Sequence, residues 1–328
     1  MTEQDEAACH FYDTRYDFVF KRLFERSEKH ELGDRVNRRC RFCGKKPPEV
    51  TFGSVAHAVP EALGNRGLTT AYECDACNNL FGRGIEDDLG KWTMPVRTMA
   101  RIRGKKGVPT LRERAEGGWR VEFKDGLLKV KSYEDNSIYE VDEANKRVIF
   151  TLRRDPYTPV AVLKAFVKIG LALLPEEELS PFATALAWIR ETDHSRQWIA
   201  SSMVIHTMQN GPMPNDRIMA AVLRRKPGVA DVPYAFLLLG YCNDLFQIVL
   251  PAPVEDAALQ DVKLTFPAFP TPDTPDPTLY GRAVSKVLDL TGRDVVRGET
   301  TRVAMRFESG TRLKPGASGL DAAGEVTE

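Results

Sequence analysis

The period of the apolar residues changes several times along the chain. Between residues 10 and 32 the aromatic and aliphatic side chains recur every three to four positions, which predicts an amphipathic helix that Gly33 ends. Residues 119–152 alternate apolar and polar residues in four short runs separated by turn residues, which predicts a β-meander. Two helices are then expected, at residues 157–174 and 180–189, the first with a strongly apolar face.

Four more apolar runs of strand length follow in the second half of the chain. The last two are separated by Cys242, Asn243 and Asp244, which predicts a buried hairpin. The predicted strands are residues 202–208, 219–225, 233–241 and 245–251.

Composition changes again towards the end of the chain. Residues 265–281 are rich in Pro, Thr and Asp, as in a linker or an extended arm, and the last residues are small and polar. The expected divisions are a helical lead-in at 1–37, a finger with a basic flank at 38–118, an α+β domain of unknown role at 119–264, a Pro-rich arm and C-terminal segment at 265–308, and a disordered tail at 309–328.

The overall composition is that of a soluble globular protein. The 328 residues are 42% hydrophobic and 28% charged, which allows two or three domains. The acidic start contains no apolar signal segment, and no apolar run approaches the roughly 18 residues that span a bilayer. We therefore expect a cytoplasmic protein with no membrane contact.

Basic residues gather in two blocks although the formal net charge is zero. Residues 35–46 carry six basic residues and no acid, and residues 91–120 carry nine basic residues against two acidic ones. Such blocks can be ordinary solvated surface, or they can follow a phosphate backbone. The candidates for nucleic-acid binding are Arg97, Arg101, Arg103, Lys105 and Lys106.

The two basic blocks flank a cysteine-rich stretch. Four of the six cysteines form two Cys-x-x-Cys pairs, Cys40 with Cys43 and Cys74 with Cys77. Two such pairs that bracket a loop are typical of a structural zinc site with four thiolate ligands. In a reducing compartment the pairs are expected to bind metal; a redox pair is the alternative.

Secondary structure within this stretch can also be predicted. Residues 50–59 are rich in small and β-branched residues and predict a short strand pair around Gly53. A helix is expected to begin near Asp75, and a second one to begin with Pro95 at its first position.

Two strings inside the cysteine brackets carry a family resemblance. A His-x-x-Pro-x-x-Leu-Gly string starts at His57, and a Cys-x-x-Cys-Asn string ends at Asn78. Together, over residues 39–92, they resemble the HNH endonuclease family, in the branch whose ββα-metal finger is stapled by four cysteines. The resemblance implies an N-terminal zinc-stapled, treble-clef-like ββα-metal finger. The apolar pattern of the rest of the chain predicts a mixed antiparallel-sheet and helix region after it, so the expected fold class is α+β.

The resemblance also implies a chemistry and the residues that perform it. His57 would be the general base of phosphodiester hydrolysis, because a histidine is mostly neutral at cytosolic pH. Asn78 would bind a catalytic Mg²⁺ or Mn²⁺, since an oxygen ligand suits a hard cation. We expect a metal-dependent endonuclease that acts on nucleic acid, with DNA as the substrate by family analogy and a role in antiviral defence or a mobile element.

The chain departs from the family pattern at two places. Ala56 stands where many members have a carboxylate ligand, and the central Asn of the motif falls near Thr69 or Thr70. Another oxygen must then complete the metal site, although Glu86 could instead orient the ring of His57. The candidates for that oxygen are Glu73, Asp75, Asn79 and Glu86.

Other interpretations of the same residues stay open. The finger could be a non-catalytic zinc module that binds nucleic acid or protein, with Ala56 marking a lost metal site. It could also staple a sensor or scaffold whose function lies in the C-terminal region, where a regulatory ligand or a second copy would bind. In these interpretations His57 is a structural or loop residue, Asn78 caps a helix, and the acidic run at 86–88 is solvated surface.

Overall fold

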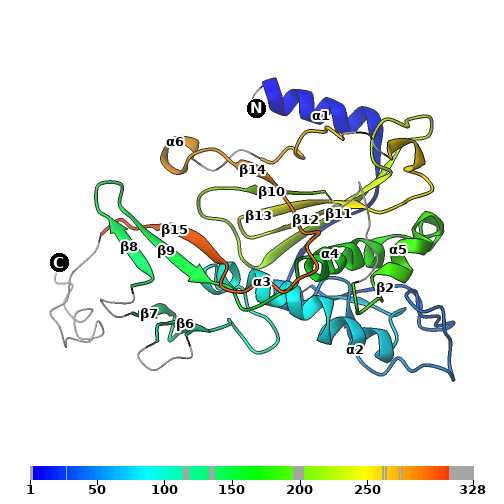
Figure 1. Cartoon of the computed structure of the whole chain (residues 1–328), viewed down its shortest axis with the longest axis horizontal. Coiled ribbons are helices and arrows are strands. Elements are labelled where there is room, and N and C mark those ends of the chain that lie inside the picture. The colour runs from blue at the N-terminus through cyan, green and yellow to red at the C-terminus, as the bar shows by residue number, and fades with distance from the viewer. Residues whose placement is uncertain are drawn as a thin grey trace.

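A six-stranded antiparallel sheet forms the centre of the protein, as the computed structural model shows (Figure 1). The structure describes residues 3–26, 28–113, 118–132, 137–194, 203–260, 262, 264–272, 274 and 276–309. The strand order is β1-β11-β12-β13-β10-β14. The strands are β1 (Tyr16–Glu25), β10 (Val204–Met208), β11 (Arg217–Arg225), β12 (Ala235–Tyr241), β13 (Asp244–Leu250) and β14 (Val284–Leu288).

The four strands predicted in the second half of the chain are confirmed as β10 to β13. Strands β12 and β13 form the predicted hairpin, which closes with Tyr241 opposite Asp244. Successive side chains along these strands point to opposite faces of the sheet, and both faces are buried. Val222 and Leu237 face one core, while Leu223 and Phe236 face another.

The helix predicted for residues 10–32 is wrong beyond Arg15. Helix α1 (Glu3–Arg15) ends there, and the chain continues as strand β1, which pairs antiparallel with β11. The aromatic residues of this segment suit a strand as well as a helix, and the pairing with residues about 200 positions away decides between them. Tyr12 of α1 packs with Tyr16 and Phe236 on one face of the sheet.

Helix α4 (Pro159–Leu173) lies against the other face of the sheet, where Figure 1 also places α3. All fifteen residues of α4 are buried, including Lys164 and Lys168. The two predicted helices at 157–174 and 180–189 are thus confirmed as α4 and α5 (Ala183–Trp188), with short 3₁₀ turns η2 (Glu176–Glu178) and η3 (Ser180–Phe182) between them.

The four strands predicted within residues 119–152 are present, but they belong to two sheets. One sheet has the order β5-β6-β7 and the other β15-β9-β8, so the prediction of a single meander is wrong. The division follows from a long-range pairing, since β9 pairs along its whole length with β15 from the end of the chain. The strands are β5 (Leu111–Arg112), β6 (Arg120–Lys124), β7 (Leu127–Lys131), β8 (Tyr139–Asp142), β9 (Arg147–Arg153) and β15 (Thr300–Arg306).

The Pro-rich segment runs back over the central sheet. Tyr12 donates a hydrogen bond to the carbonyl of Pro267 at 2.5 Å, and the N–H of Phe269 donates to Gln247 of β13. The short helix η4 (Ala257–Leu259) precedes this segment, and α6 (Pro277–Tyr280) lies at its C-terminal end. The predicted disordered tail lies outside the described residues beyond Ser309.

No helix in the described ranges combines the length and the apolar character that a bilayer-spanning helix needs.

Candidate active site and zinc centre

The cysteine-rich stretch folds as a small sheet followed by two helices. Strands β3 (Ala56–His57) and β4 (Leu68–Thr70) are antiparallel, and β2 (His30–Leu32) pairs parallel with β4. The expected strand pair around Gly53 is therefore wrong, because the partner of β3 comes after the turn η1 (Glu61–Leu63). The next elements are α2 (Asp75–Arg83) and α3 (Ile85–Met99).

The two helices are divided at a glycine. Gly84 has φ −112° and ψ −105°, a conformation that is not helical. Helix α3 then runs through Pro95, which lies inside it, so the prediction that Pro95 begins a helix is wrong. Trp92 and Thr98 of α3 are buried on either side of this proline, and tertiary packing thus outweighs the local cost of a proline in a helix.

The four thiols of the two Cys-x-x-Cys pairs converge. Their sulfur atoms all lie within 4.8 Å of one another, and Cys43 Sγ is 3.8 Å from Cys74 Sγ. Zn–S bonds of about 2.3 Å in a tetrahedron place the sulfurs about 3.8 Å apart, so the cluster fits zinc. The hydrogen bond between Cys40 and Cys77 lowers the pKa of Cys40 to about 4 and raises the pKa of Cys77, so Cys40 ionises before Cys77.

Asp75 fixes the loop before β3. Its carboxylate accepts hydrogen bonds from the N–H groups of Gly53 at 2.9 Å and Ser54 at 2.7 Å, and from the Thr51 hydroxyl. These three donors lower the pKa of Asp75. To bind a metal, these oxygens would have to give up their hydrogen bonds to the loop. This geometry therefore favours a structural role for Asp75 over the role of metal ligand that the sequence suggests.

His57 lies on β3, half-buried and opposite Thr69 of β4. Burial lowers its pKa, and the nearby Glu61 carboxylate opposes that shift only in part. The imidazole is therefore neutral at pH 7. Among the described residues neither ring nitrogen has a hydrogen-bond partner, so the ring is free to accept a proton.

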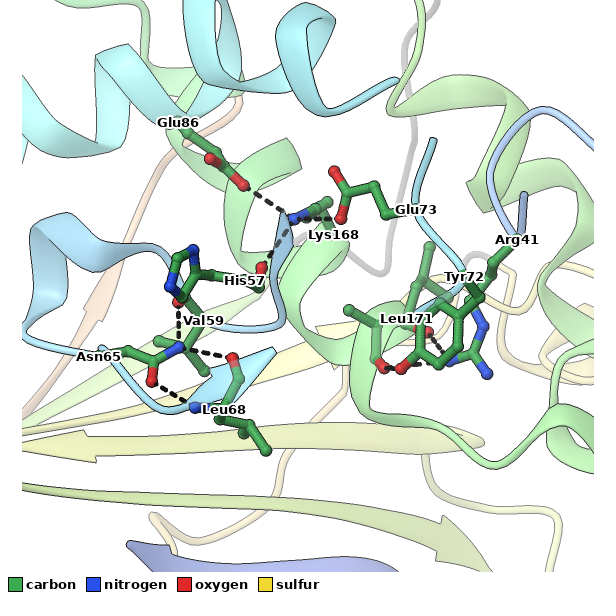
Figure 2. Close-up of polar contacts among 11 residues, drawn as sticks. Arg41, His57, Val59, Asn65, Leu68, Tyr72, Glu73, Glu86, Lys168 and Leu171 are labelled. Carbon is green, nitrogen blue, oxygen red and sulfur yellow. Dashed lines mark hydrogen bonds and ion pairs between the residues drawn. The ribbon is translucent and has the colours of Figure 1, made fainter. Parts of the chain in front are cut away.

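A buried lysine lies directly behind His57 (Figure 2). Lys168 Nζ of α4 donates to the His57 carbonyl at 3.2 Å and forms ion pairs with Glu73 at 3.0 Å and Glu86 at 2.9 Å. Burial opposes the charged form, but the two carboxylates raise the pKa of Lys168 above its usual value, so the ammonium is retained. Burial also raises the pKa of Glu73 to about 7, against the attraction of Lys168.

The finger also caps both ends of α4. Asp88 of α3 accepts a hydrogen bond from the N–H of Thr158, just before α4, at 2.8 Å. Arg41, between Cys40 and Cys43, stacks 3.7 Å from the centre of the Tyr72 ring. Its guanidinium donates to the last carbonyl oxygens of the helix, at Leu171 (3.0 Å), Ala172 (3.0 Å) and Leu174 (2.7 Å).

Sequence reasoning missed Asn65, which shapes the turn between β3 and β4 (Figure 2). Its fully buried amide donates to the carbonyls of Val59 at 2.6 Å and Leu68 at 2.9 Å, and it accepts from two backbone N–H groups. The sequence places the motif's asparagine near Thr69 or Thr70, whereas Asn65 is the asparagine that organises this loop. Its position in Leu63-Gly64-Asn65, directly after the histidine string, is the signal that could have found it.

Comparison with protein families agrees with this geometry. Residues 40–94 match the family model described as HNH endonuclease. This part of the chain is an HNH endonuclease domain. The resemblance of this segment to the HNH endonuclease family is thus confirmed, as is an α+β architecture with a four-cysteine cluster in its N-terminal part. No curated protein and no solved structure matches the chain.

Asn78 lies in the first turn of α2 in the HNH domain, half-buried. Its side-chain amide makes no hydrogen bond to any described residue. Glu86, the other oxygen expected near His57, is engaged with Lys168. Within the described ranges, the four cysteines are the one group of three or more His, Cys, Asp or Glu side chains whose ligand atoms converge. Asn78 therefore stays a prediction as a metal ligand, and its side-chain oxygen is not engaged by any described residue.

The five basic residues expected to bind nucleic acid differ in exposure. Arg97 is buried, and its guanidinium donates to Thr93 Oγ1 at 3.0 Å and to the carbonyls of Ala62 at 2.9 Å and Gly90 at 2.6 Å. Its predicted contact with nucleic acid does not fit this burial, because every branch of the guanidinium is used inside the HNH domain. The exposed members are Arg101, Arg103, Lys105 and Lys106.

Removal of zinc ligands tests the metal centre. We expect one zinc ion per wild-type chain, and Cys40→Ser with Cys74→Ser to lose it and to unfold at a lower temperature, because binding of the metal contributes to folding. Metal analysis with thermal unfolding measures both. Cys9→Ser with Cys242→Ser is the matched control and should keep its zinc. Zinc that survives Cys40→Ser with Cys74→Ser, or a wild-type chain without one zinc ion, would refute the assignment.

Lys168→Met tests the buried charge network. The substitution leaves Glu73 and Glu86 without their cation, and we expect the free energy of unfolding to fall by about 3–5 kcal/mol. Urea unfolding measures this loss. Adding Glu73→Gln and Glu86→Gln to Lys168→Met removes the uncompensated charges and should restore part of the stability; a triple variant less stable than Lys168→Met would contradict the account.

Proposed function

We propose that this chain is a metal-dependent endonuclease that hydrolyses phosphodiester bonds, with His57 as the general base. The observation that supports this most strongly is the placement of His57. A neutral histidine with no hydrogen-bond partner for its ring among the described residues lies in a segment matched to HNH endonucleases, and its strand is held from behind by a buried cation.

In the proposed reaction His57 takes a proton from a water molecule as the water oxygen attacks phosphorus. The bond from phosphorus to the leaving oxygen breaks opposite the attacking oxygen, and solvent supplies the proton that this oxygen needs. A bound Mg²⁺ or Mn²⁺ would supply the positive charge that stabilises the extra negative charge on the phosphate. Lys168 holds the carbonyl of His57, and it thereby fixes the strand that presents the imidazole.

Asn78 and Glu86 have different parts in this proposal. The unbonded amide of Asn78 leaves its oxygen available to a hard cation, in keeping with the family resemblance. Glu86 keeps Lys168 charged and lies close enough for its own charge to act on His57. It is therefore better placed to support the base than to bind the ion.

DNA is the proposed substrate by family analogy, and the exposed residues Arg101, Arg103, Lys105 and Lys106 would follow its backbone. A cytoplasmic enzyme that cuts DNA suits defence or a mobile-element system, and we extend the proposal to that setting. The β-rich region after the HNH domain would then bind a regulatory ligand or a second copy of the chain.

One observation favours a second function. Ala56 is buried and offers no oxygen at the position where a carboxylate ligand is common in the resemblance. A zinc-stapled module that binds nucleic acid or protein without cutting is the corresponding alternative, alone or as part of a sensor or scaffold.

Plasmid cleavage separates these functions. Purified protein with Mg²⁺ or Mn²⁺ should nick or linearise plasmid, and His57→Ala should lower the rate by a factor of about 10²–10⁴, as expected when a general base is removed. His10→Ala, which removes an exposed histidine of α1, is the control and should cleave at the wild-type rate. Cleavage that survives His57→Ala would exclude His57 as the base, and the absence of cleavage with either ion would favour the binding module.

A further inference from the structure

An open pocket beside the HNH domain is lined by three arginines from three separate segments. Arg26 follows β1 at the edge of the central sheet, Arg66 lies in the turn before β4, and Arg103 follows α3. The pocket has a volume of about 450 Å³, and its other lining residues are Glu25, Gly107 and Asp216.

Backbone contacts hold these segments together. The N–H of Arg26 donates to the carbonyl of Asp216 at 2.9 Å, which ties it to the start of β11. Gly67, next to Arg66, lies so close to the chain after β1 that a Cβ atom there would be 1.5 Å from the carbonyl oxygen of Glu28. The N–H of His30 donates to the carbonyl of Gly67 at 2.9 Å. The position of Arg66 beside Arg26 is therefore fixed by the fold.

The third segment is a tight turn that packs on η1. Gly104 and Gly107 exchange backbone hydrogen bonds of 3.0 and 3.2 Å, which closes the turn and exposes Lys105 at its tip. A Cβ atom at Gly104 would lie 3.5 Å from the carbonyl oxygen of Glu61, so the turn rests directly against η1. Arg103 enters the pocket from this turn.

The three guanidinium groups outnumber the two acidic side chains that line the pocket. In the part of the chain that the structure describes, none of them has an ion-pair or side-chain hydrogen-bond partner. Glu25 is paired instead with Arg217, at 3.4 Å. Burial lowers the pKa of Arg26, and the charges of Arg66 and Arg103 lower it further, as expected for cations held close together. Among the described residues of the lining, Asp216 remains as the one unpaired acid, so the pocket keeps a net positive charge.

The pocket is close to the proposed base. The turn that carries Arg103 rests on Glu61 of η1, four residues after His57, and the charge of Glu61 acts on the pKa of both His57 and Arg26. Lys105, on the turn that carries Arg103, also acts on His57. A chain of phosphates that reached His57 could therefore extend into the pocket across η1.

We infer that Arg26, Arg66 and Arg103 form a binding pocket for a backbone phosphate of the nucleic acid, next to the phosphodiester that His57 attacks. Three planar guanidinium groups that donate to no side chain among the described residues suit the oxygens of a phosphodiester. This inference rests on the proposed function for the identity of the ligand. It adds Arg26, which lies outside the HNH domain, and so assigns the edge of the central sheet a part in holding the substrate.

Binding of a fluorescein-labelled duplex tests the pocket without requiring catalysis. In a His57→Ala background, Arg26→Ala with Arg66→Ala and Arg103→Ala is compared with Arg282→Ala, Lys286→Ala and Arg302→Ala, which remove the same charge from exposed positions in the C-terminal region. Fluorescence anisotropy is measured over a range of NaCl concentrations, with DNA and RNA duplexes in separate arms. Circular dichroism and zinc content show that both variants are folded.

We expect the pocket variant to bind at least tenfold more weakly than the control. The slope of log K against log salt should become shallower by about 0.9 for each DNA phosphate that the variant no longer neutralises. Equal affinity and slope in the two variants, or no binding by the His57→Ala parent, would overturn the pocket. Weaker binding only in the pocket variant supports it even when the wild-type protein does not cleave. If the wild-type protein cleaves and the pocket variant binds as tightly as the control, the nuclease proposal is supported and the phosphate-binding role of the pocket is refuted.

Discussion

The arrangement of this protein depends on one buried ammonium group. Lys168 Nζ has three close partners: it donates a hydrogen bond to the His57 carbonyl and forms ion pairs with Glu73 and Glu86. A buried charge is tolerated only when such partners are all in place. The strand that carries the histidine, the approach to the second cysteine pair and the start of α3 are therefore fixed together, by a side chain outside the matched segment.

Helix α4, which supplies this lysine, depends in turn on the HNH domain. A carboxylate, Asp88, lies at its N-terminal end and a guanidinium, Arg41, at its C-terminal end, which is the favourable orientation for both charges relative to the helix dipole. The apolar sides of α4 pack against the central sheet. The HNH domain and the sheet are thus two sides of one folded unit that share α4. The region after the HNH domain is a structural support for the proposed active site, whatever else it binds.

The sequence is most informative where function or topology requires a fixed local spacing. The Cys-x-x-Cys pairs predict the thiolate cluster, because a tetrahedral metal site requires a fixed spacing of its ligands. The alternation of apolar and polar residues predicts β10 to β13, because successive side chains of a strand point to opposite faces. Contacts between segments that are distant in the sequence give no such local pattern. The pairing of β1 with β11 makes a strand of a segment for which the local pattern predicts a helix. The sequence shows Lys168 only as one of two lysines in an apolar helix, and its ion pairs with Glu73 and Glu86 appear only in the fold. Arg97 likewise resembles a surface cation in the sequence, although the fold buries it.

Proton transfer by His57 in phosphodiester hydrolysis can be tested by chemical rescue. His57→Gly leaves a space in the half-buried site that an imidazole molecule can occupy. Single-turnover cleavage of DNA by this variant, with Mg²⁺ or Mn²⁺, is measured over a range of imidazole concentrations at fixed pH and ionic strength. Very slow cleavage that rises with the concentration of neutral imidazole is expected if His57 is the base. Unassisted cleavage at the wild-type rate, or no response to imidazole in a variant that still binds DNA and zinc, would contradict it.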